Sequence, residues 1–230
     1  MKKWLHTSLL MFLSLTLSVA QNRVDYGIFS RAAGVRSLLF RGRLQPHYVQ
    51  QAPNDGSTYF AYSKDFEKGT VVFRGKLYTD VLMNLNAHTD ELCIKDLVRG
   101  LAVILPKEYI GSFSIGLHQY EYLKQDVGSA QKTGYYEVLY AGKVKLWKKI
   151  RKIFHEEPEN GVLRRGFQLS ESFYLWKNNT WNVVNKESDL RRLYPDQKNI
   201  IKRLARERNL AFGKNRERYL TDVVIYLDQL

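Results

Sequence analysis

Apolar and polar residues alternate along the middle of the chain, from about Val35 to Val184. A period of two is typical of half-buried β-strands, and turns that contain Gly or Asn separate the successive runs. Strands joined by such short links must be antiparallel, because a parallel pair needs a long crossover. The pattern predicts these strands: Val35–Phe40, Thr58–Tyr62, Thr70–Phe73, Lys76–Asn84, Glu91–Lys95, Leu101–Leu105, Ser112–His118, Tyr135–Tyr140, Val144–Ile150, Phe173–Trp176 and Trp181–Val184.

Residues 186–230 follow a helical period. We expect a short helix capped by Ser188 or Asp189, then helices over Gln197–Asn209 and Asn215–Asp228. Such short amphipathic helices are not stable alone in water, so they should pack their apolar faces on each other or on the sheet. The expected class is therefore α+β: an antiparallel sandwich or open barrel over residues 21–185, followed by two or three C-terminal helices over 186–230 that pack on it. Strand–helix–strand alternation is absent, which argues against a doubly wound nucleotide-binding fold.

The first twenty residues have the pattern of a secretory signal peptide. Lys2 and Lys3 precede an apolar stretch over Leu9–Leu17, and Ser18-Val19-Ala20 offers small residues for cleavage before Gln21. The alternative is a membrane anchor, but the apolar run of about a dozen residues is shorter than the roughly 20 that a spanning helix needs. We expect an exported mature protein without a transmembrane segment, located in the periplasm, at the outer membrane or outside the cell.

Composition and cysteine content exclude several further classes of protein. The chain of 230 residues is 44% hydrophobic and 13% aromatic, which argues against intrinsic disorder. Cys93 is the single cysteine, so neither an internal disulfide nor a Cys-based zinc finger is possible. Its place in an alternating run predicts a small buried hydrophobic residue.

The basic excess belongs to the C-terminal part of the chain. Residues 143–230 carry 20 basic and 11 acidic side chains, whereas residues 21–142 carry 14 and 12. Such asymmetry can mark a polyanion partner, although a solvated basic face that aids solubility is the favoured alternative. An exported protein is not expected to meet nucleic acid. The candidate polyanion-binding residues are Lys145, Lys148, Lys149, Lys198, Lys202 and Arg206.

Sequence signatures of catalysis are mostly absent. Gly142-Lys143 is followed by Val144 and lacks the spacing of a P-loop. Neither a Gly-x-Ser-x-Gly elbow nor a His-Glu-x-x-His zinc motif occurs. We therefore predict no cofactor, no metal site and no assigned catalytic residue.

Two clusters of titratable residues could carry chemistry. His155-Glu156-Glu157 precedes the turn signal Pro158-Glu159-Asn160-Gly161, so a solvated acidic loop is favoured over a cation site or a base. His88-Thr89-Asp90-Glu91 joins two expected strands, and an ordinary turn is favoured there. His118 has no acidic residue within three positions, which leaves only distant partners for it.

Aromatic residues gather on an expected hairpin with Asn178-Asn179-Thr180 at its tip. Tyr174, Trp176 and Trp181 could stack on a sugar or a base. Cross-strand aromatic pairs also stabilise antiparallel sheets, and this structural role is favoured.

Three stretches taken in order resemble a known group of proteins. They are 69–92, which begins Gly-Thr-Val-Val-Phe-Arg-Gly-Lys-Leu-Tyr, then 134–150, and then 172–196, which leads into the basic helix. Together they resemble secreted envelope proteins of unassigned function that are common in Bacteroidota. The resemblance covers most of residues 35–230 and implies an exported protein of a Gram-negative envelope. It supplies no catalytic residues.

These observations favour a non-enzymatic envelope protein that binds another protein or an anionic envelope polymer. One alternative is a secreted hydrolase of glycans or peptides, with acid–base groups drawn from different loops. Another is a polyanion-binding protein that uses its basic C-terminal face and weakens with salt.

Overall fold

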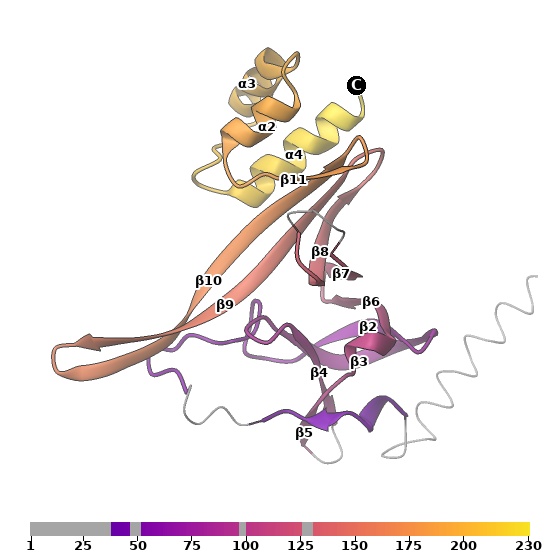
Figure 1. Cartoon of the computed structure of the whole chain (residues 1–230), viewed down its shortest axis with the longest axis vertical. Coiled ribbons are helices and arrows are strands. Elements are labelled where there is room, and N and C mark those ends of the chain that lie inside the picture. Colours follow the sequence, from indigo (N-terminus) through magenta and orange to yellow (C-terminus); the bar gives the residue numbers. More distant parts are fainter. Residues whose placement is uncertain (1–37, 47–51, 97–99, 126–130) are drawn as a thin grey trace, which may run out of the picture.

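The computed structural model describes residues 38–46, 52–96, 100–125 and 131–230. Its main element is one antiparallel sheet of 11 strands in the order β1-β5-β4-β3-β2-β6-β7-β8-β9-β10-β11 (Figure 1). The sheet is open and does not close into a barrel, so the expected α+β antiparallel class is confirmed. Its strands are β1 (Arg43–Leu44), β2 (Glu67–Phe73), β3 (Lys76–Asn86), β4 (Glu91–Asp96), β5 (Leu101–Ile104), β6 (Ile110–Ile115), β7 (His118–Leu123), β8 (Gly134–Ala141), β9 (Lys145–Glu159), β10 (Val162–Lys177) and β11 (Thr180–Val183).

Three expected strands differ from the structure. Ser112–His118 is divided between β6 and β7, because Gly116 takes a φ of 55° and turns the chain. Thr58–Tyr62 forms only one isolated bridge, between Phe60 and Asn86. The described part of Val35–Phe40 is a 3₁₀ turn, η2 (Leu38–Phe40), and a second such turn, η4 (Lys107–Tyr109), precedes β6.

The β9–β10 hairpin is much longer than its sequence pattern predicts and projects as an arm from the rest of the sheet (Figure 1). His155, Glu156 and Glu157 lie within β9, so the expectation that they form a loop is wrong. The turn itself is at Asn160 and Gly161, whose φ values are 52° and 79°. Pro158 is paired with Leu163 of β10, but its nitrogen is on the side of β9 that faces away from β10. No hydrogen bond to β10 is lost there, so the strand accommodates the proline.

Three helices cover one end of the sheet: α2 (Glu187–Leu193), α3 (Lys198–Glu207) and α4 (Arg216–Asp228). Their apolar faces share a core with Leu146, Phe173 and Leu175 of β9 and β10. A second core lies between η2 and strands β2 to β9, and includes Met83, Leu92 and Ile150. No helix in the described ranges is long and apolar enough to cross a membrane. The expected leader, Met1–Ala20, lies outside the described residues.

Candidate functional site

A concentration of ionisable groups lies between the two cores. Along one face of β9, Leu146 belongs to the helix-covered core and Ile150 to the second core, with Lys148 between them. Lys148 is paired in register with Glu137 of β8, and their side chains are only 1% and 4% exposed. Tyr62, His118 and Glu217 surround this buried pair and are themselves 36–44% exposed. We call the five residues the buried ionic cluster, after its central pair.

Hydrogen bonds and ion pairs surround Lys148 and Glu137, the two charged residues at the centre of the cluster. The Lys148 Nζ lies 2.9 Å from Glu137 Oε2, 2.5 Å from Glu217 Oε2 and 2.5 Å from the Tyr62 hydroxyl. That hydroxyl donates to Glu137 Oε2 at 2.5 Å, and His118 Nδ1 lies 2.6 Å from Glu137 Oε1. Burial, followed by the Glu137 carboxylate, raises the pKa of Tyr62, so its hydroxyl keeps the proton that it donates.

This geometry restricts the chemistry of the cluster. The Lys148 Nζ has an oxygen partner for each of three N–H donors, so the described residues already occupy its hydrogen-bonding capacity and leave no donor for a substrate. His118 is half-exposed, stacked on Tyr62 and oriented by Glu137, as a general base would be. None of its partners in the network is Ser, Thr or Cys, and the one hydroxyl present, that of Tyr62, already donates to Glu137. The network therefore holds no serine-type hydroxyl or thiol for His118 to activate. The cluster therefore fits best as a clamp between the cores.

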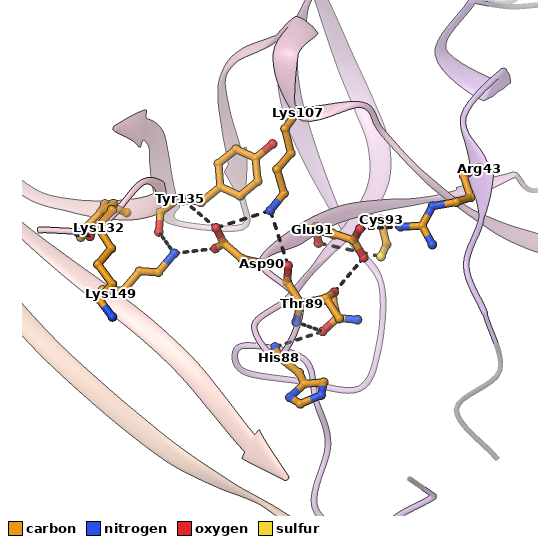
Figure 2. Close-up of polar contacts among 12 residues, drawn as sticks. Arg43, His88, Thr89, Asp90, Glu91, Cys93, Lys107, Lys132, Tyr135 and Lys149 are labelled. Atoms are coloured by element: carbon orange, nitrogen blue, oxygen red, sulfur yellow. Dashed lines mark hydrogen bonds and ion pairs between the residues drawn. The ribbon is translucent and has the colours of Figure 1, made fainter. Parts of the chain in front are cut away.

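A second ion pair lies on the opposite side of β9 (Figure 2). Lys149 Nζ is 2.5 Å from Asp90 Oδ1 and donates to the Tyr135 carbonyl at 2.9 Å. Asp90 also accepts the Tyr135 amide at 3.2 Å, and Lys107 Nζ lies 3.7 Å from it. Burial lowers the pKa of Lys149, and the Asp90 carboxylate opposes that effect. The expected turn at 88–91 is confirmed, and its Asp90 ties it to β8 and β9.

An open cavity of about 270 Å³ lies on the arm. It brings together His155, Glu157 and Glu159 of β9 with Asp55 and Arg164. The Ser57 side chain and amide lower the pKa of Asp55, whose Oδ2 is 4.0 Å from His155 Nε2. Arg164 pairs with Glu159 at 2.8 Å. In the described part of the chain, no group of three His, Cys, Asp or Glu residues is placed to hold a metal ion.

The candidate polyanion-binding residues do not share one face. Lys145 on β9 and Lys198, Lys202 and Arg206 on α3 are exposed. Lys148 and Lys149 are buried on opposite sides of β9, and carboxylates neutralise both. Lys148 and Lys149 therefore do not lie on a common exposed basic face with the other four residues, and polyanion binding by those four stays a prediction.

The candidate stacking residues form one aromatic cluster. Trp176 and Trp181 are paired in register across β10 and β11, with ring centroids 5.1 Å apart. Tyr174 is buried edge-on against Tyr136 at 5.4 Å, and Trp147 lies 4.8 Å from Trp181. These contacts supply the cross-strand packing that was favoured for them. A ligand-stacking role for the half-buried Trp176 and Trp181 stays a prediction.

The sequence did not predict Tyr62, Glu137 or Glu217 as members of a site. Glu137 and Lys148 are opposite one another across two strands, and Glu217 comes from a distant helix. The usable signal was a charged residue at an inward position of an alternating run, in Tyr135-Tyr136-Glu137-Val138. His118 does have the distant acidic partner that its sequence neighbourhood lacks.

Comparisons of the chain with protein-family models, with curated proteins and with solved structures gave no match.

Proposed function

We propose that this protein is an exported, non-enzymatic binding protein of the cell envelope that holds a protein partner along the β9–β10 arm. Export rests on the leader pattern at residues 1–20, and the envelope location rests on the resemblance described above. The contact surface rests on the arm. It carries four large apolar side chains that are 43–67% exposed: Ile153, Val162, Leu163 and Leu169.

The two edges of the arm differ. On the β10 side, the loop at 54–57 covers the edge: the Asn54 amide donates to the Arg165 carbonyl, and the Phe167 amide donates to Ser57 Oγ. On the β9 side, the Lys152 amide donates to the Ala87 carbonyl. Alternate residues of a strand direct their amides to the same side, so those of Phe154 and Glu156 point outward beyond this contact.

Among the described residues these two amides have no backbone partner, and this open edge carries the proposal. It is bounded by Ala87 and His88 at one end and by Pro158, which has no amide, at the other. A short extended segment of a partner can add to it as a further strand, next to the exposed Ile153 of β9. The proline and the flanking charges limit such pairing to a short register, which is how edge strands avoid nonspecific aggregation.

The test is site-specific photo-crosslinking in cells with a photoreactive phenylalanine at position 153 on the arm. The matched control carries the same group at position 117, where Leu117 is 98% exposed in the β6–β7 turn. We expect one discrete protein adduct from position 153, in the envelope fraction, and none from position 117. Equal labelling at both positions, or an adduct confined to the cytosol, would overturn the proposal.

A further inference from the structure

A basic depression lies between α2 and α3, away from the arm and from the buried ionic cluster. It has a volume of about 550 Å³ and is lined by Ser188, Arg191, Arg192, Pro195 and Lys198. Residues 186–214 around it carry nine basic and four acidic side chains. Three cations and a hydroxyl therefore face one hollow in a positively charged region.

Each of the two guanidinium groups is held by a carboxylate of α2. Arg191 lies 2.8 Å from Glu187 Oε2, and the Tyr219 hydroxyl of α4 donates to the other oxygen of that carboxylate at 2.8 Å. Arg192 lies 3.2 Å from Asp189 Oδ1, whose second oxygen accepts the Lys186 amide at 3.0 Å. Each arginine uses a terminal nitrogen for its carboxylate, which leaves other donors of the planar group available.

One of those donors lacks an acceptor. The Nε of Arg191 is enclosed, and no hydrogen-bond partner for it occurs among the described residues. A buried donor without an acceptor costs free energy. Because the Nε is enclosed, an anion in the depression would contact the terminal nitrogens of Arg191 and Arg192, whose side chains are 35% and 74% exposed. Lys198 makes no ion pair within the described ranges, so it adds a positive charge that no carboxylate offsets.

We infer that this depression binds a phosphate group. A fixed guanidinium matches the geometry of phosphate oxygens, and Lys198 and the Ser188 hydroxyl add further donors. Glu187 and Asp189 offset part of the charge of the two arginines, so Lys198 supplies the positive charge that no carboxylate in the described ranges offsets. The volume accommodates a phosphate together with part of the molecule that carries it. Of the predicted polyanion-binding residues, only Lys198 belongs to this site. The inference does not depend on the proposed role of the arm.

The test uses two probes on the full chain: inorganic phosphate by calorimetry, and flotation with phosphatidylcholine vesicles with and without phosphatidylglycerol. Arg192→Gln and Lys198→Gln should each weaken binding about tenfold, the loss expected for one charge-assisted hydrogen bond. Lys143→Gln removes an equal charge from an exposed turn outside the depression and should leave binding unchanged. Arg191 is left intact because it also holds Glu187.

The probes separate the two sources of phosphate. Binding of inorganic phosphate that is sensitive to both variants assigns the site to a soluble phosphate. Binding only to phosphatidylglycerol vesicles, with the same sensitivity, assigns it to a lipid headgroup. If neither probe binds, or if Lys143→Gln weakens binding as much as the other variants, the attraction is absent or diffuse and the inference is refuted.

Discussion

Replacement of Lys148 by methionine should strongly destabilise the fold. The change removes an ammonium that is 1% exposed and leaves Glu137, itself 4% exposed, as a carboxylate without its cation. At the observed 2.9 Å separation and an effective dielectric constant of about 20, the lost attraction is about 6 kcal/mol before desolvation. Part of that is recovered because Lys148 no longer has to be desolvated. Measured cases of one partner removed from a buried pair cost about 3–5 kcal/mol, and we expect a loss in that range.

Urea unfolding followed by tryptophan fluorescence would measure this loss, since Trp147 adjoins Lys148 on β9. The double variant Lys148→Met with Glu137→Gln should lose less than the sum of the single variants, because neither charge is then buried alone. Arg203→Gln is the control: its pair with Glu207 on α3 is 63% exposed at both ends, and we expect a loss below about 0.5 kcal/mol. If Lys148→Met costs no more than Arg203→Gln, or if the two cluster substitutions are additive, the clamp interpretation is refuted.

Three further results are expected. Burial raises the pKa of Cys93 to about 12, so the native thiol should not react with Ellman's reagent at pH 8 and should react fully in urea. Because the unfolded thiol loses its proton first, stability should fall as pH rises from about 9 toward 12, and the fall should be shallower in Cys93→Ala; an identical slope in that variant would contradict the assignment. Asp228→Ala should destabilise the protein by about 1–3 kcal/mol in urea unfolding, because the buried Val144 amide, 3.1 Å from Asp228 Oδ1, loses its acceptor. Asn179 has a φ of 56°, so Asn179→Val should lower thermal stability by about 1–2 kcal/mol while Asn179→Gly should not, and equal melting temperatures would show that this turn relaxes freely.

The helices and turns that the sequence predicts correctly are those whose conformation depends on residues close together in the chain. The helix expected over Asn215–Asp228 is observed as α4 over Arg216–Asp228, with Asn215 accepting the Arg218 amide as its cap. The expected strands Thr70–Phe73 and Lys76–Asn84 leave only Arg74 and Gly75 between them, and this pair forms the turn between β2 and β3, with φ values of 52° and 75°. In both cases the deciding residues lie within a few positions of one another, so a side chain's own neighbours determine the conformation.

The length of the arm could not be predicted in this way. Between Arg151 and Ser172 polar and charged residues interrupt the alternation, and Pro158 and Gly166 are unusual inside strands. The ladder persists because β9 and β10 are adjacent along a single hairpin, and because cross-strand pairs such as Glu156–Arg165, at 2.6 Å, support it. The length of the ladder thus depends on pairing between two strands, and the pattern within one strand does not predict that pairing.

The sequence by itself determined that the chain forms an antiparallel sheet and ends in amphipathic helices. The period of apolar and polar residues predicts both, and that period is a property of neighbouring residues. Only the tertiary structure decided which charges are solvated. Lys148 and Lys149 belong to the same basic run as Lys145, yet the order of strands encloses the first two and leaves Lys145 exposed. The acidic partners come from β8, from the 88–91 turn and from α4. Burial depends on what packs over a residue, and the chain brings those segments together only when it folds.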